Sequence, residues 1–250
     1  MSVDYSKYLE VCKYAVTDNW TFNNFRRHPS YQRILEHHDM KEIGQKYLDN
    51  IVATNPKILK NIKTFQANDK LGNPEVFKYD IDGVKYNVSP TTLRYISILS
   101  DIMTLHLELK SYDIVEIGVG YGGLCRLINN FALPWSYTLV DLPEVLELAK
   151  KYLAHFSMPE NRIDFVELKD LKPREYDLCI SNYAFTEINR LYQNEYKKLI
   201  IDNSKHGYLT CNFINGRDSY SPAEVKSMKR NYTILPEIPL TAPDNFIYTW

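Results

Sequence analysis

The stretch that decides the fold reads Val115-Glu-Ile-Gly-Val-Gly-Tyr-Gly-Gly123. The chain has 250 residues and only nine glycines, and four of those nine lie in this stretch. Glycine allows tight backbone turns and lets a ligand lie against the bare main chain. We therefore expect a strand at residues 113–118, a helix at 122–132, and a binding loop between them.

Downstream of this loop, strand-like and helix-like segments alternate. This alternation is typical of parallel β-α-β units with helices on both faces of a sheet. Two final strands follow each other without a helix, and such strands can pair antiparallel. We predict an α/β fold with a mostly parallel seven-stranded sheet in which one strand is reversed. Besides 113–118, the predicted strands are 136–141, 163–168, 176–181, 207–213, 231–235 and 245–250, and the helices are 143–156 and 189–203.

Upstream of the loop, residues 77–88 alternate around Asp82-Gly83, a strong signal for a two-residue hairpin turn. Ser89-Pro90 then supplies an N-cap and a first-turn proline for another helix. Residues 1–75 show apolar residues at helical spacing. We expect residues 76–250 to form the main domain and residues 1–75 a helical cap that excludes water from the site.

Composition narrows the function classes. The 30 basic and 31 acidic residues give a formal charge of −1, which favours neither a nucleic-acid nor a membrane partner. No apolar run is long enough to cross a membrane, and no apolar leader follows Met1. The four cysteines form no C-x-x-C pair and none lies at metal-binding spacing from a histidine. We expect a cytoplasmic protein without a metal, whose oligomeric state, a homodimer included, stays open.

Two classes of ligand fit the glycine spacing. Gly118-x-Gly120-x-x-Gly123 satisfies the dinucleotide fingerprint, which predicts a dehydrogenase that binds NAD. Gly118-x-Gly120-x-Gly122 fits the loop that binds S-adenosylmethionine equally well. The glycines alone therefore leave the ligand undecided.

The residues around the loop favour S-adenosylmethionine. Glu116 lies at the end of the first strand, where a carboxylate would repel a pyrophosphate but suits a cationic amine and sulfonium. Asp141 ends the second strand and can accept hydrogen bonds from both ribose hydroxyls in either class. The residues after Gly123 complete one sheet and leave no separate substrate domain of the kind that a dehydrogenase usually has.

The chain resembles class I S-adenosylmethionine-dependent methyltransferases in residues 115–123, in Leu139-Val-Asp141 and in Tyr176-Asp-Leu-Cys-Ile-Ser-Asn182. Ser181-Asn-Tyr-Ala-Phe-Thr-Glu187 and Ser89-Pro-Thr-Thr-Leu-Arg-Tyr-Ile96 are similar to a family named for sugar O-methylation. The resemblance covers residues 76–250. It implies a Rossmann-like fold, S-adenosylmethionine as donor, S-adenosylhomocysteine as product, and a sugar, sugar nucleotide or surface glycan such as a capsular polysaccharide as acceptor.

The expected donor site combines the loop with the ends of neighbouring elements. Arg94 belongs to a helix that leads into the first strand, so it can bind the donor carboxylate. Like Arg26 and Arg27, it can also grip a diphosphate or form an ordinary ion pair. The donor-binding residues that we expect are Glu116, Gly118, Gly120, Tyr121, Gly122, Asp141, Leu142, Asn182 and Arg94.

Methyl transfer to a hydroxyl calls for a base that takes the proton. The resemblance places Asn182 and Tyr183 beside the transferred methyl, with Tyr183 as a candidate catalytic residue. Glu187 is the first candidate base, because it lies beyond the carboxyl end of a strand, where ligands bind in open α/β sheets. His28 in the cap is the second. Their plainer interpretations are a carboxylate at a helix start and an exposed loop histidine.

Other acceptor classes fit less well. Base N-methyltransferases resemble one another in an Asp/Asn-Pro-Pro-aromatic motif, and Asn182-Tyr-Ala-Phe185 lacks both prolines. Catechol-type enzymes hold Mg²⁺ with an acid at this point and an Asp-Asn pair after the next strand, which this chain lacks there. Two alternatives stay open: O-methylation of another small polar or phosphorylated intermediate of surface-glycan decoration, and a non-catalytic partner protein that binds S-adenosylmethionine.

Overall fold

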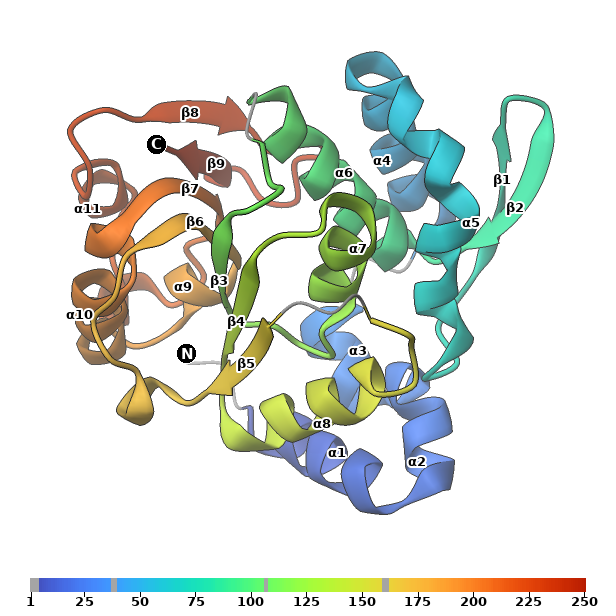
Figure 1. Ribbon diagram of the computed structural model, residues 1–250, viewed down its shortest axis with the longest axis horizontal. Coiled ribbons are helices and arrows are strands. Elements are labelled where there is room, and N and C mark those ends of the chain that lie inside the picture. The colour runs from blue at the N-terminus through green and yellow to red at the C-terminus, as the bar shows by residue number, and fades with distance from the viewer. Residues whose placement is uncertain (1–4, 37–39, 106–107, 159–161) are drawn as a thin grey trace.

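The structure, a computed structural model, describes residues 5–36, 40–105, 108–158 and 162–250. A seven-stranded sheet lies at its centre, with helices on both faces (Figure 1). The strand order is β5-β4-β3-β6-β7-β9-β8. In that order the strands are Arg162–Val166, Ser136–Val140, Asp113–Ile117, Tyr176–Asn182, Ser204–Cys211, Phe246–Thr249 and Thr233–Pro236.

The direction of the strands confirms the predicted topology. From β5 to β7 all neighbours are parallel, whereas β9 pairs antiparallel with both β7 and β8. The chain runs outward from β3 through β4 to β5 and then returns to the other side of β3 as β6. Ligands of open α/β sheets bind at such a switch point, outside the carboxyl ends of the strands.

Successive strand residues feed two separate cores because their side chains alternate between the faces. Ile114 and Ile180 pack on the face covered by α6, α7 and α8, whereas Val115 and Cys179 pack on the face covered by α9, α10 and α11. Helices thus cover both faces, as predicted. The first three helices are Pro90–Thr104, Gly123–Ala132 and Pro143–Leu153, and the other three are Ala184–Glu187, Arg190–Leu199 and Pro222–Lys226.

The predicted hairpin and helix start are also confirmed. Strands β1 (Phe77–Ile81) and β2 (Val84–Val88) pair antiparallel around Asp82 and Gly83, whose φ angles are 52° and 78°. Two positive φ angles are what a two-residue hairpin turn of this kind requires. At the start of α6, the Ser89 hydroxyl accepts a hydrogen bond from the Thr92 N–H at 3.1 Å.

The N-terminal region is helical and shares the core of α6, α7 and α8. Figure 1 shows α1 and α2 running beside α8. The Lys151 ammonium of α8 donates to the carbonyl oxygens of Ala15 and Val16 at the end of α1, at 2.9 and 3.0 Å. No helix among the described residues combines the length and apolarity needed to cross a bilayer. Helices α1 to α5 are Ser6–Thr17, Asn19–Asn24, Pro29–Leu35, Lys41–Thr54 and Ile62–Phe65.

Candidate functional site

The loop between β3 and α7 is shaped by left-handed glycines. Gly118, Gly120 and Gly122 have φ angles of 78°, 53° and 81°, a region that side chains disfavour. Gly118 also permits close packing, because a Cβ added there would lie 2.0 Å from the Cβ of Ala184. Its N–H donates to the Val140 carbonyl at 3.0 Å, which fixes the loop beside the end of β4.

Asp141 follows β4 and closes the loop from the neighbouring strand. Its Oδ2 accepts from the Val119 N–H and its Oδ1 from the Leu142 N–H, both at 2.7 Å. Burial raises the pKa of Asp141 to about 6, although these backbone N–H groups oppose the shift. The Gly120 N–H also bonds to this carboxylate. A carboxylate has about four lone-pair sites, so Asp141 keeps capacity for a further donor such as a ribose hydroxyl. Leu142, 50% exposed, lies beside it.

Glu116 lies inside the core rather than on the loop surface. Its side chain is buried, and Oε2 accepts from the Tyr137 hydroxyl at 2.8 Å. Burial raises the pKa of Glu116 to about 8, with a further contribution from the charge of Asp141. The carboxyl is therefore mostly protonated at neutral pH in the folded protein, and its contact with a donor stays a prediction.

The raised pKa of Glu116 predicts a pH-dependent stability. The unfolded chain ionises this carboxyl near pH 4.5 and the folded protein near 8, so the free energy of unfolding falls as the pH rises between them. The loss approaches about 1.4 kcal/mol per pH unit. Glu116→Gln removes this titrating group. Between pH 5.5 and 7.5 the free energy of unfolding of the wild type, measured in urea, should therefore fall by about 2 kcal/mol more than that of the variant. Parallel pH profiles would contradict the assignment.

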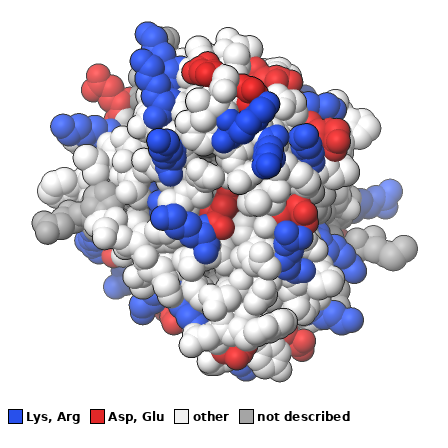
Figure 2. Space-filling view, turned by 90° about the vertical axis from the view of Figure 1, so that its right-hand side faces the viewer, with Lys and Arg blue, Asp and Glu red and all other residues white. Residues whose placement is uncertain are grey.

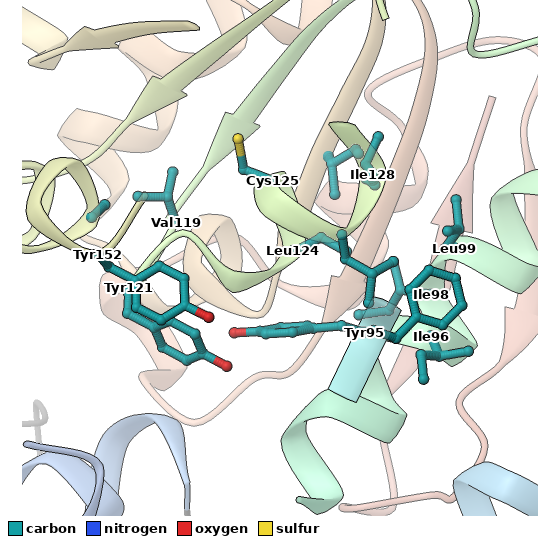
Figure 3. Close-up of a cluster of buried hydrophobic side chains, with 14 of the residues drawn as sticks. Tyr95, Ile96, Ile98, Leu99, Val119, Tyr121, Leu124, Cys125, Ile128 and Tyr152 are labelled. Carbon is teal, nitrogen blue, oxygen red and sulfur yellow. The ribbon is translucent and has the colours of Figure 1, made fainter. Parts of the chain in front are cut away.

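The N-terminal helices cover the glycine loop. A Cβ added to Gly120 would lie 2.9 Å from Cδ1 of Leu35, the last residue of α3. Tyr121 turns its ring into the core, where it packs edge-on against Tyr152 with 4.8 Å between ring centroids, and near Tyr95 (Figure 3). The Tyr121 hydroxyl has no hydrogen-bond partner among the described residues. The side chain thus serves packing, and its contact with a donor stays a prediction.

Glu187 lies at the carboxyl edge of the sheet, beyond β6 and β7. Its Oε2 accepts from the Tyr5 hydroxyl at 2.8 Å, and its Oε1 accepts from the side-chain amide of Asn212. Asn212 directly follows β7, and its own Oδ1 accepts from the Thr186 hydroxyl at 3.2 Å. The candidate base is thus held by the N-terminal segment on one side and by the end of β7 on the other.

Tyr183 has a strained backbone, with φ 67° and ψ −39°. Its N–H donates to the Thr210 carbonyl at 2.8 Å, and its hydroxyl donates to the buried carboxylate of Glu237. Asn182 accepts from the Thr210 hydroxyl at 3.1 Å. Strain of this kind costs about 1–3 kcal/mol and concentrates at functional sites. Tyr183 is thus both the strained residue and a residue that the resemblance places beside the transferred methyl.

Other candidates have structural contacts. His28 is exposed and caps α3, its Nδ1 accepting from the Ser30 N–H at 3.3 Å. Its ring makes no hydrogen bond to Glu187 within the described residues. Arg26 is fully buried and forms ion pairs with Glu36 at 2.5 Å and Asp69 at 3.2 Å. The observed contacts are thus those of an exposed histidine at a helix start for His28 and of an ion-paired arginine for Arg26.

Three residues of this region carry no functional signal that was recognised in the sequence. Tyr5 only fitted a helical spacing, and its contact with Glu187 joins segments far apart in the chain. Asn212 is the second-last residue of the predicted strand 207–213, so the rule about carboxyl ends of strands could have found it. Glu237 lies in the connection between β8 and β9, where no sequence signal marked it.

Comparison with known proteins adds similarity of fold. No protein-family model matches the chain, and no curated protein matches it. The methyltransferase domain of bacterial CtHen1 aligns with a TM-score of 0.48 and 16% identity over 62% of this chain and 96% of that one. Magnesium protoporphyrin IX methyltransferase (ChlM) from Synechocystis PCC 6803, with bound SAM, gives 0.48 and 13% over 62% and 78%. PH1948 from Pyrococcus horikoshii, described as an RNA methyltransferase, gives 0.47 and 13% over 76% and 96%.

Proposed function

We propose that this protein is a methyltransferase that uses S-adenosylmethionine to methylate a hydroxyl of a sugar, sugar nucleotide or surface glycan. The observation that carries the proposal is the left-handed glycine loop at the switch point of the sheet, with Asp141 at the end of the adjacent strand. When bound, S-adenosylmethionine supplies an electrophilic methyl group. The sugar as acceptor rests on the resemblance of residues 89–96 and 181–187.

The residues of the loop suit this donor chemically. Gly118, Gly120 and Gly122 carry no side chains of their own, so a donor that displaces the Leu35 side chain from Gly120 can lie against the main chain. The spare capacity of Asp141 suits a ribose hydroxyl, and the half-exposed Leu142 suits an apolar ring. Glu116 supplies a carboxyl near Asp141. The positive charge of a bound sulfonium or amine would favour the ionised form of this carboxyl. Asn182 completes the set at the end of β6.

The acceptor hydroxyl must lose a proton as its oxygen forms the new bond to carbon. Glu187 takes this proton in our proposal, and Tyr5 and Asn212 hold its carboxylate in one orientation. Tyr183, whose hydroxyl is held by Glu237, borders the same edge of the sheet. Alignment of the two reacting atoms at about 3–3.5 Å is the main task of the remaining contacts.

The charge distribution supports a small or glycan acceptor. The formal charge is −1, and on the face seen in Figure 2 basic and acidic side chains are interspersed. A nucleic-acid site usually shows a basic stripe.

S-adenosylmethionine with a labelled methyl group, incubated with the protein and an extract of the source cells, tests the reaction. Label in a sugar, sugar nucleotide or glycan supports the proposal.

The other results of that experiment are equally informative. Label confined to other small molecules favours the phosphorylated or polar intermediate as acceptor. Binding of S-adenosylhomocysteine in calorimetry without any transfer of label favours a non-catalytic partner protein. Binding of NAD in place of S-adenosylhomocysteine would contradict the proposed donor.

A further inference from the structure

Of the three arginines that the sequence offers as anion ligands, Arg94 alone forms no ion pair with a carboxylate among the described residues. Arg26 and Arg27 form ion pairs with carboxylates. Arg94 is only 6% exposed, and its Nε has no hydrogen-bond partner among the described residues. Within those residues its one hydrogen bond runs from Nη2 to the Leu35 carbonyl at 3.5 Å, at the long limit for such a bond.

Burial lowers the pKa of Arg94, but the charges of Tyr95, Tyr47, Tyr183 and Glu36 outweigh burial and raise it, so the guanidinium stays charged although no carboxylate among the described residues lies within ion-pair distance. The guanidinium carbon lies 5.6 Å from the ring centroid of Tyr95 and 5.9 Å from that of Tyr183. Such contacts contribute little compared with the several kcal/mol that burial of an unpaired ion costs. A buried guanidinium with unused N–H donors can bind an anion through strong charge-assisted hydrogen bonds.

Arg94 lines a cavity of about 20 Å³ between α6 and the ends of β6 and β7, which also contacts Asn182 and Tyr183. This volume has room for about one water-sized group, so one oxygen of a carboxylate or phosphate can enter it while the rest of the anion stays outside the cavity. Within the described part of the chain, neither the glycine loop nor Asp141 nor Leu142 lines the cavity. The cavity therefore borders the predicted methyl-transfer region at Asn182 and Tyr183 and not the predicted nucleoside site.

Two carboxyl groups also face this cavity, and both have donors of their own. Asp101 accepts from the Tyr208 hydroxyl at 2.7 Å. Glu237 accepts from Tyr183, from Thr241 and from the side-chain amide of Asn245 at 3.1 Å. Neither forms an ion pair with Arg94 in the described residues. The guanidinium thus stays available although acids are present.

We propose that Arg94 binds a carboxylate or phosphate group of the methyl acceptor, so that the acceptor is an acidic molecule such as a uronic acid, a sugar phosphate or a sugar nucleotide. The inference rests on the proposed function and narrows its acceptor class. The rival source of the same chemistry is the donor's own carboxylate. The donor carboxylate is a rival ligand because Leu35 links Arg94 to the glycine loop. The Leu35 carbonyl accepts from Arg94, and the Leu35 side chain covers Gly120.

Inorganic phosphate is the probe, titrated by calorimetry into the free protein and into the protein saturated with S-adenosylhomocysteine. We expect phosphate to bind both forms of the wild type. Arg94→Gln should weaken phosphate binding about 10–100-fold, and Arg94→Lys, which keeps the charge, should weaken it less. Arg230→Gln is the matched control. It removes one exposed positive charge that does not line the cavity, so it should leave phosphate binding unchanged.

Each other outcome overturns a stated part. If S-adenosylhomocysteine displaces phosphate and 5′-methylthioadenosine, which lacks the amino-acid part, does not, then Arg94 binds the donor carboxylate. Equal phosphate binding by wild type and both Arg94 variants would remove the anion site. If Arg94→Gln fails to fold by thermal unfolding, Arg94→Lys decides. A labelled product that an anion exchanger does not retain also overturns the inference. Failure of S-adenosylhomocysteine to bind contradicts the proposed function instead, while phosphate binding to the free protein still reports on Arg94.

Discussion

Replacing Glu187 with glutamine is expected to lower methyl transfer about 10²–10⁴-fold, because an amide cannot take the proton of the acceptor hydroxyl. The side chains are nearly the same size, so donor affinity should stay the same. The substitution also sets an amide beside the Asn212 amide that now donates to Glu187. Turnover with labelled S-adenosylmethionine and calorimetry with S-adenosylhomocysteine separate the two effects.

Two further variants serve as controls for this prediction. Tyr5→Phe removes the phenol that contacts Glu187 but keeps the carboxylate, so it should slow transfer by less than about tenfold. His28→Asn removes the second candidate base, whose observed contact is the cap of α3. Wild-type turnover in Glu187→Gln together with an inactive His28→Asn would reverse the assignment of the base.

Replacing Asp141 with alanine is expected to weaken binding of S-adenosylhomocysteine by about 1.5–3 kcal/mol, roughly 10–100-fold, from the loss of charged hydrogen bonds. The same carboxylate holds the Val119 and Leu142 N–H groups, so the loop also loses a fixed anchor. Asp202→Ala, which removes an acid paired with Lys197 at the surface, is the matched control. Unchanged affinity in Asp141→Ala would remove Asp141 from the donor site.

The pKa of Asp141 gives this prediction a second test. Because that pKa is raised to about 6, the carboxylate accepts hydrogen bonds at pH 7.5 but is largely protonated at pH 5. Affinity of the wild type for S-adenosylhomocysteine should therefore fall as the pH is lowered across this range. Asp141→Asn should bind weakly at both pH values, and an equal pH response in both proteins would contradict the assignment.

Local sequence signals were sufficient to predict the fold. The turn at Asp82-Gly83 and the cap at Ser89 act over a few residues, so they can be recognised without tertiary information. The glycine loop and the strand 136–141 are separate in the sequence. Their neighbourhood followed from the rule that successive β-α-β strands lie side by side. The reversed strand followed from the missing helix between the last two strands.

The environments of individual side chains could not be predicted in the same way. The sequence placed Glu116 at the strand end nearest the loop, but not its burial against Tyr137, which depends on packing from β4. Tyr121 follows a glycine of the loop, yet its ring turns inward because α8 and the N-terminal helices supply an aromatic pocket. Tyr5 reaches Glu187 only because α1 packs across the sheet edge, a contact without a local signal.

The buried contacts of Arg26 help to hold the N-terminal helices against α6. They connect the N-terminal helices to Asp69, which in turn accepts from Ser89 at the start of α6. Arg26, Glu36 and Asp69 all belong to the N-terminal region, and hydrogen bonds to Ser89 and Thr91 join them to α6. A rigid swing of that region would break these buried hydrogen bonds, at about 1–3 kcal/mol for each group left unsatisfied, so we expect the N-terminal helices to stay in place. For the proposed methyl transfer, we expect donor and product to pass at the uncharged contacts, the Leu35 side chain over Gly120 and the Tyr5 hydroxyl on Glu187.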